Sequence, residues 1–297
     1  IRGEMNNTSA LLKNTAKTFV LLAALGGLAV AIGGLLGGST GALIGFGFDM
    51  LMVLSSYWFS DKLALRAARA HVVTEAEAPE FHRLVRNLAD RAGLPMPKVA
   101  LSPSPQPNAF ATGRSPRHAV VCATQGLLQT LPYDEVEGVM AHELMHVKHR
   151  DILIGSIAAG IATGISYAAQ MMMFSAMFGG RDDDDRGSAM GALAVAILAP
   201  VAASLIQMAV SRSREFEADR GAAELLGSGE SLARALERIE VLAARSPMAI
   251  NPAQASAWIH NPLAEARATR GTNMTRLFST HPDTAERIRR LREYQFS

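Results

Sequence analysis

Four long apolar stretches divide the chain into alternating apolar and mixed segments. They run over about 18–36, 40–59, 152–178 and 190–210. Each has at least close to the ~20 residues that a helix needs to cross the hydrocarbon core of a bilayer. Long core helices of soluble proteins usually carry charge along one face, whereas Asp49 is the single charge in all four stretches. The pattern therefore predicts a mainly α integral membrane protein with four transmembrane helices.

The segment from about 61 to 151 predicts an α+β unit with a small β-sheet. Apolar residues at helical spacing begin near Pro79 and stop at Gly93, which predicts a helix. Pro132 opens a second helix with acidic residues near its positive N-terminus, a favourable placement. Between the two helices lie three short runs rich in β-forming residues, at 99–101, 108–112 and 119–122.

Beyond the fourth apolar stretch, three more helices complete the expected domain. They are predicted at 211–227, 231–245 and 283–294. The chain therefore divides into a transmembrane pair, the first part of a soluble domain, a second transmembrane pair and the second part of that domain. These four parts span 1–60, 61–151, 152–210 and 211–297.

Composition narrows the possible functions. The chain is 49% hydrophobic and 19% charged with a net charge of +2, so bulk charge gives no case for nucleic-acid binding. The single cysteine, Cys122, excludes an internal disulfide and a Cys-rich zinc site. Any metal must therefore be held by His, Asp or Glu side chains.

The distribution of basic residues predicts the orientation in the membrane. Lysine and arginine precede the first stretch, follow the second, precede the third and follow the fourth, whereas the turn after the first stretch is uncharged. The acidic run 182–185 marks a solvated loop between the last two stretches. Because positive residues collect on the cytoplasmic side, both termini and the soluble domain are predicted to be cytoplasmic. The first stretch is not expected to be a cleaved signal peptide, since a second span follows almost at once.

The segment His142-Glu143-Leu144-Met145-His146 predicts metal-dependent chemistry. Residues four apart share one face of an α-helix, so both imidazoles point toward a common spot. Neutral imidazole binds Zn²⁺ well, and a glutamate beside such a pair can act as general base on a metal-bound water. We therefore expect His142 and His146 to bind zinc and Glu143 to be the catalytic base.

A catalytic zinc usually takes a third protein ligand. His149 lies on roughly the same helical face but about 10 Å along the helix from His142, too far for both to reach one ion. Glu215 is the better candidate, because Asp219 one turn later can accept the free N–H of a ligating imidazole. The two predicted spans between His146 and Glu215 return the chain to the side it left, so both motifs emerge at one membrane surface.

These motifs, with Asn-Ala-Phe-Ala-Thr-Gly at 108–113 and His281-Pro282, resemble the HtpX family of bacterial membrane zinc proteases, a relative of the CaaX prenyl endoproteases. The resemblance covers nearly the whole chain. It implies a gluzincin-like zinc protease domain with one Zn²⁺ and with the three ligands and the base named above. It also implies ATP-independent cleavage of misfolded or damaged membrane proteins at the bacterial inner membrane, in quality control and stress response, often alongside an AAA+ protease.

Peptide hydrolysis needs two further features. A donor must stabilise the developing oxyanion, and His281 is the candidate through its motif, with an ordinary surface histidine as the alternative. Asn108, Ala109 and Phe110 would lie on an edge strand to which an extended substrate adds main-chain hydrogen bonds. The alternative is an ordinary buried strand with a turn at Gly113.

Two other functions stay open on the sequence alone. An intramembrane metalloprotease would place its zinc-binding helix within the bilayer, but charged residues flank this motif and favour the membrane surface. A membrane chaperone or adaptor would keep zinc for structure only, although such a site needs no base and Glu143 is present. Asp49 is interpreted as a protonated or hydrogen-bonded acid against the third span, or as a functional charge.

Overall fold

The computed structural model describes residues 27, 30, 38–48, 50, 51, 54, 55, 57–151, 212–245 and 284–294. The predicted spans at 152–178 and 190–210, and nearly all of 18–36, lie outside this part of the chain, as does Asp49. The described parts of 40–59 are helical, and so is the segment 57–67. No helix built from these described residues is both long and apolar enough to span a membrane.

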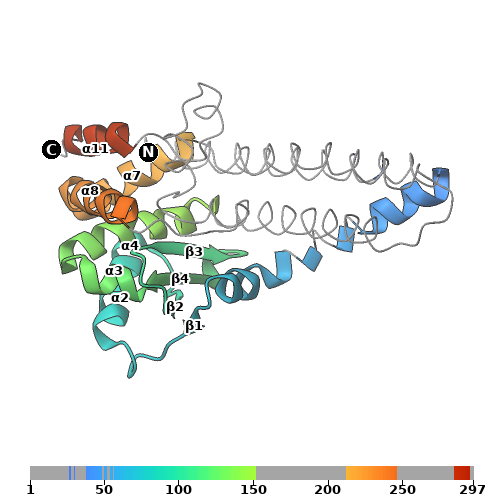
Figure 1. Cartoon of the computed structure of the whole chain (residues 1–297), viewed down its shortest axis with the longest axis horizontal. Coiled ribbons are helices and arrows are strands. Elements are labelled where there is room, and N and C mark those ends of the chain that lie inside the picture. The colour runs from blue at the N-terminus through green and yellow to red at the C-terminus, as the bar shows by residue number, and fades with distance from the viewer. Residues whose placement is uncertain are drawn as a thin grey trace.

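A mixed β-sheet lies in the middle of the described domain (Figure 1). Its strands follow the order β1-β2-β4-β3, in which β2 and β4 are parallel and the other two pairs are antiparallel. The strands are β1 (His71–Val72), β2 (Lys98–Ser102), β3 (Ala109–Gly113) and β4 (Ala119–Thr124). The three predicted strands are present, and β3 lies at an edge of the sheet. The sequence pattern missed β1, because two residues are too few to show alternation.

Different helices cover the two faces of this sheet. One face joins the main core with α2 (Pro79–Ala92) and α4 (Tyr133–Lys148), through Val99, Val121 and Ala123. The opposite face packs against the helical segment 57–67, through Ala100, Phe110, Val120 and Cys122. Successive strand residues point to opposite faces, so burial on both sides explains why 119–123 reads as an unbroken apolar run.

The central helix of the domain is α4. It contacts α2, α7 (Arg212–Leu226), α8 (Glu230–Arg245) and the strands β3 and β4. Most of its residues are buried on all sides, so it has no polar face of the kind expected of a surface helix. Gly138 lets α8 approach closely, since a Cβ there would lie 2.7 Å from the backbone nitrogen of Leu232.

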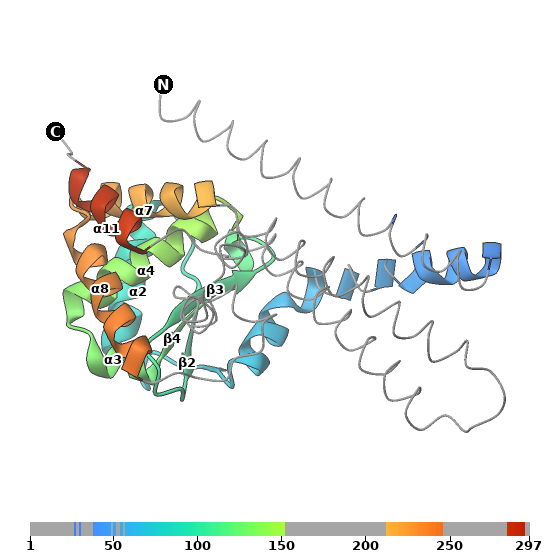
Figure 2. The same cartoon turned by 45° about the horizontal axis from the view of Figure 1, so that its top comes forward.

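The helix boundaries agree with the sequence expectations to within two residues for α7, α8 and α11 (Thr284–Glu293). The predicted helix stop at Gly93 is also observed, with φ of 68° in the left-handed region. Two short elements were not predicted, η1 (Pro116–His118) and α3 (Gln125–Thr130). Figure 2 shows α4, α7, α8 and α11 gathered on one side of the sheet, where they bring distant parts of the sequence together.

Candidate metal centre

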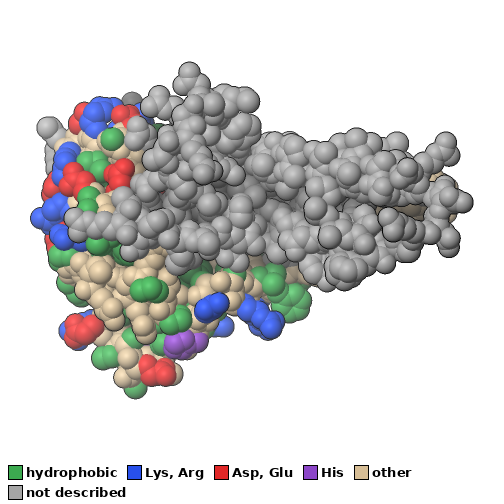
Figure 3. All heavy atoms as spheres, viewed as in Figure 1, with side chains coloured by type: hydrophobic (Ala, Val, Ile, Leu, Met, Phe, Trp, Pro, Cys, Tyr) green, Lys and Arg blue, Asp and Glu red, His purple; other side chains and the backbone are tan. Residues whose placement is uncertain are grey.

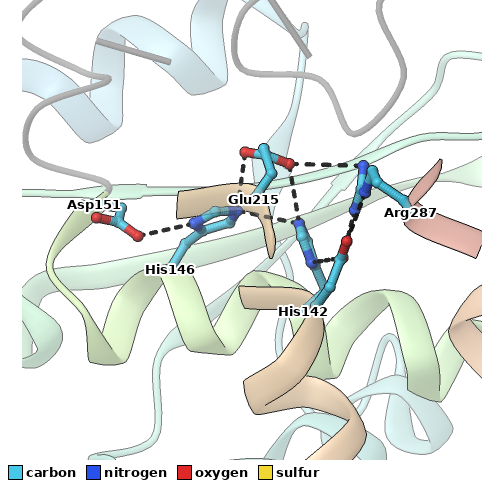
Figure 4. A network of polar contacts seen from close by, with 6 residues as sticks. His142, His146, Asp151, Glu215 and Arg287 are labelled. Atoms are coloured by element: carbon cyan, nitrogen blue, oxygen red, sulfur yellow. Dashed lines mark hydrogen bonds and ion pairs between the residues drawn. The ribbon is translucent and has the colours of Figure 1, made fainter. Parts of the chain in front are cut away.

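Three side chains from two helices converge at one point beside the sheet (Figure 4). His142 and His146 lie one turn apart on α4, and Glu215 comes from the first turn of α7. The two Nε2 atoms are 3.1 Å apart. Glu215 Oε2 is 3.6 Å from His142 Nε2, and Glu215 Oε1 is 3.5 Å from His146 Nε2. One atom from each residue can therefore face a single ion.

Each imidazole has a carboxylate on its other nitrogen. His142 Nδ1 lies 2.9 Å from Asp219 Oδ1, and His146 Nδ1 lies 3.2 Å from Asp151 Oδ2. A carboxylate only accepts hydrogen bonds, so with a metal bound both Nδ1 atoms would carry the proton and both Nε2 atoms of the neutral rings would offer a lone pair. At these distances the two lone pairs and the oxygens of Glu215 would repel one another unless a metal ion or a proton lay between them.

The geometry and the charge fit a divalent ion. Tetrahedral zinc with ligand bonds of ~2.1 Å places its ligands about 3.4 Å apart, close to the separations given above. Among the residues that the structure describes, the centre buries the carboxylates of Glu143, Asp151, Glu215 and Asp219, and two guanidinium groups, those of Arg214 and Arg287. With neutral imidazoles, these groups leave two negative charges, which a divalent cation would balance.

Neighbouring charged groups set the pKa values of His142 and of Asp219 beside it. Burial by itself lowers the pKa of His142, but the nearby carboxylates of Asp219 and Glu215 outweigh burial and raise this pKa to about 9. Burial likewise favours the neutral form of Asp219, yet Arg287 and His142 keep the pKa of the Asp219 carboxyl below its usual value. Both groups therefore hold their charges at neutral pH when no metal is bound.

Arg287 of α11 was not among the residues predicted from the sequence. Its side chain is only 2% exposed, and Nε and Nη2 donate to the two oxygens of Asp219 at 2.8 and 2.7 Å. Its Nη1 also lies 3.6 Å from Glu215 Oε2. The available signal was helical periodicity, because Arg287 shares the buried face of α11 with Leu291, four residues later.

The partner of His146 was also missed. Asp151 was read only as a charge flanking the motif, because five residues separate it from His146 along what the pattern suggested was continuing helix. Instead α4 ends at Lys148, and Arg150 adopts a left-handed conformation with φ of 60°. That turn folds the chain back, so the Asp151 carboxylate reaches the imidazole.

Glu143 lies in the buried centre, on α4 between the two histidines in sequence. Its side chain is 5% exposed. Its negative charge acts on the groups around it: with burial as the larger cause, it raises the pKa of the Cys122 thiol on β4 to about 12. It also contributes to the raised pKa of Arg287. The Glu143 carboxylate therefore lies close enough to act electrostatically on Cys122 in the sheet and on Arg287 of α11.

The remaining predicted residues fall in different places. Asn108, Ala109 and Phe110 are buried at the beginning of β3, where Asn108 Oδ1 accepts a hydrogen bond from the Ala109 nitrogen at 2.7 Å. His281 lies outside the described residues. His149 caps the C-terminus of α4 and does not join the three-residue cluster.

The chain is similar to known peptidases. The family profile of peptidase family M48 matches residues 75–295. A protein named "Protease HtpX homolog" from Ralstonia nicotianae is 52% identical over 282 residues, covering 94% of this chain and 96% of the relative. One of the same name from Thermococcus kodakarensis is also 52% identical, over 280 residues, covering 93% and 94%.

The fold is also similar to that of a solved structure. The crystal structure of S. mikatae Ste24p matches with a TM-score of 0.50 at 20% sequence identity. The match covers 95% of this chain and 66% of that protein.

Proposed function

The chain belongs to peptidase family M48 and is a metalloendopeptidase, and we propose that it cleaves polypeptides with a zinc ion held by His142, His146 and Glu215. The observation that carries this proposal is the arrangement of the two rings. Their Nδ1 atoms face carboxylates, while their Nε2 atoms converge with a third carboxylate. Imidazoles held by outer carboxylates in this way are typical of zinc sites.

The side chains divide the chemistry among them. Bound zinc would supply a Lewis acid that polarises the scissile carbonyl and makes water more acidic. Glu143 accepts the proton of the attacking water and returns it to the departing amine. Asp219 and Asp151 orient the two imidazoles, and Arg287 in turn holds Asp219. These orienting contacts are present before any substrate binds, which lowers the entropy cost of reaching the transition state.

Two variants distinguish the role of Glu143 as general base from the role of Glu215 as zinc ligand. Glu143→Gln keeps the size of the side chain but removes the proton acceptor, so peptide hydrolysis should fall at least about a thousandfold while one zinc per chain is retained. Glu215→Gln should lose both zinc and activity. Hydrolysis by Glu143→Gln at the wild-type rate would contradict the assignment of the base. Zinc binding without turnover in the wild-type protein would favour the structural-zinc alternative.

Substrate binding is proposed to use β3. This strand pairs only with β4 within the described sheet, so its other edge carries backbone groups that an extended peptide can bind. A photoreactive residue in place of Ala111, which is half-buried on β3, should cross-link an unfolded substrate in the Glu143→Gln protein. The same group in place of Arg83 on the exposed side of α2 should not. Equal cross-linking at both positions would contradict a specific strand.

His281 is proposed as the group that stabilises the oxyanion, on the resemblance of its His-Pro motif. Such a role predicts that His281→Phe lowers kcat with little change in KM, because the oxyanion forms only in the transition state. Zinc content should remain one per chain. A kcat within about twofold of the wild-type value would make His281 an ordinary surface residue.

The chain is further proposed to be a multi-pass protein of the bacterial inner membrane, divided at 1–60, 61–151, 152–210 and 211–297, with its catalytic domain and both termini in the cytoplasm. The four apolar stretches and the distribution of basic residues support this topology. A fluorescent reporter fused after Thr280 should report the cytoplasm, and a periplasmic phosphatase fused there should be inactive. The opposite pair of results would reverse the orientation.

Its substrates are proposed to be misfolded or damaged membrane proteins, in quality control and stress response alongside an AAA+ membrane protease. The relatives named as HtpX homologues support this role. In cells that lack the protein, an unfolded membrane substrate should persist longer after heat stress. Wild-type protein should restore its turnover, and Glu143→Gln should not.

A further inference from the structure

A polar pocket opens where the helical segment 57–67 meets one end of the sheet. Its volume is about 410 Å³, within the range of ~300–1,000 Å³ found for small-molecule sites. The groups that can bind a ligand there are Trp58, Asp61, Lys98, Arg114, Arg117 and His118, and we call this the sheet-end pocket. None of these residues belongs to the metal centre.

The sheet topology explains why basic residues from separate segments meet in this pocket. Lys98 begins β2, and Arg114 directly follows β3. Arg117 and His118 lie in η1, immediately before β4. Because β2 and β4 are parallel and β3 is antiparallel to β4, these positions share one end of the sheet. Thr112 Oγ1 donates to the Ser60 carbonyl at 3.4 Å and joins the helix to that end.

The charges of the pocket are not balanced. Lys98, Arg114 and Arg117 supply three permanent positive charges, against the single carboxylate of Asp61. Asp61 Oδ1 accepts a hydrogen bond from the backbone nitrogen of Lys62 at 2.9 Å. Within the described part of the chain none of the three cations forms an ion pair, whereas every arginine of α2 and α11 does. The pocket therefore offers unsatisfied donors to an anion.

Aromatic side chains place this pocket beside the predicted membrane surface. Trp58 is 55% exposed at the end of the second apolar stretch, next to Tyr57 and the half-exposed Phe59. The Arg114 guanidinium lies over the Trp58 ring, 4.7 Å from its centroid. Lys62 lies over Phe59 in the same way, at 5.5 Å. Aromatic residues flanked by lysine and arginine are typical of the level of the lipid headgroups.

We propose that the sheet-end pocket binds the phosphate group of an anionic phospholipid. Arg114 and Arg117 provide forked N–H donors that match phosphate oxygens, and Lys98 adds a point charge. Trp58 contacts the glycerol or the upper acyl chain at the interface. A lipid bound here would fix the orientation of the domain on the membrane. This inference rests on the membrane topology proposed above, but not on proteolysis.

The experiment uses the full-length protein in a non-ionic detergent. The chain contains two tryptophans, so Trp258→Phe leaves Trp58 as the fluorescent reporter. Phosphatidylglycerol in mixed micelles should change the Trp58 emission with a saturable dependence, whereas zwitterionic phosphatidylcholine should not. Arg114→Gln with Arg117→Gln should weaken phosphatidylglycerol binding at least about tenfold.

The matched control removes the same charge elsewhere. Arg66 and Arg69 lie later on the helix or in the turn after it, are exposed, and do not line the pocket. Arg66→Gln with Arg69→Gln should therefore weaken binding by less than about threefold, through diffuse attraction alone. Equal weakening by both pairs would overturn the pocket as the binding site.

Two further outcomes are decisive. Inorganic phosphate that produces the same change in Trp58 emission, and displaces the lipid at equal concentration, would assign the pocket to free phosphate and overturn the lipid assignment. Zinc content and peptide hydrolysis are measured on the same samples and should be unchanged in the Arg114/Arg117 variant. Lipid binding in a protein that does not hydrolyse peptides would leave this inference standing and contradict the proposed function.

Discussion

The two sides of α11 hold arginines in opposite environments. Arg287 points inward, where it is 2% exposed and bonded to both oxygens of Asp219. Arg292 points outward, where it is 43% exposed and pairs with Glu230 and Glu237 of α8. Figure 3 shows acidic and basic side chains intermixed on the surface at the end of the molecule where α8 and α11 lie. Both are ion pairs of similar length between helices.

The difference between them is solvation. Water screens the outer pairs, and holding two long side chains together costs entropy, so each stabilises the protein little. The inner pair has no water to replace a lost partner, so removing one partner leaves a buried charge uncompensated. Burial therefore turns the same contact from a surface feature into one on which the metal centre depends.

The thiol of Cys122 measures how strongly burial disfavours the charged form of a side chain. Because burial and Glu143 raise the pKa of its thiol to about 12, the reactive thiolate is scarce at pH 8. Alkylation of the native protein should be at least about a thousandfold slower than alkylation after unfolding in guanidinium chloride. As the exposed reference, Arg292→Cys in a Cys122→Ala background should react at nearly the unfolded rate. Rapid labelling of native Cys122 would contradict the burial of this side chain in the sheet.

Arg287→Met should be strongly destabilising. It leaves Asp219 buried with its charge uncompensated, which costs about 3–5 kcal/mol of unfolding free energy. Zinc affinity should fall as well, because Asp219 no longer holds His142 in place. Adding Asp219→Asn should recover part of the stability but not the zinc affinity. Chemical denaturation of the single and double variants measures this coupling, and strictly additive effects would show that the pair does not act as one unit.

Removal of the metal should lower the stability of the protein. With free zinc a thousandfold above its Kd, binding contributes about 4 kcal/mol, so a chelator should lower the unfolding midpoint by roughly 10 °C. Wild type and Arg292→Gln should lose the same amount. Glu215→Gln should lose much less, because it binds little zinc to begin with. An unchanged midpoint in the chelated wild-type protein would contradict a structural contribution of the metal.

Arg292→Gln should have the smallest effect. Both of its carboxylate partners remain in contact with water, so the unfolding midpoint should move by less than about 2 °C. Raising the salt concentration should remove even that difference. Zinc affinity and peptide hydrolysis should stay at wild-type values. A loss as large as that of Arg287→Met would mean that exposure does not separate the two kinds of ion pair.

Local patterns predicted the parts of the molecule that depend on neighbours in sequence. The helical spacing of His142 and His146, the stop at Gly93 and the strand predicted at 119–122 all follow from side-chain spacing, from a local run of β-forming residues or from the conformational preference of one residue. The turn at Arg150, which follows the end of α4, was not predicted, because the sequence has no glycine or proline there. That turn is also what brings Asp151 to His146.

What the sequence determined by itself is therefore a set of helices and strands, a two-histidine motif and a carboxylate able to join it. The tertiary structure decided which charges surround that motif. Arg287 lies 68 residues from Asp219, and only the packing of α11 against α7 and α8 brings the two together. Periodicity along one helix carries no information about distance to another, whereas burial in a shared core depends on both helices at once.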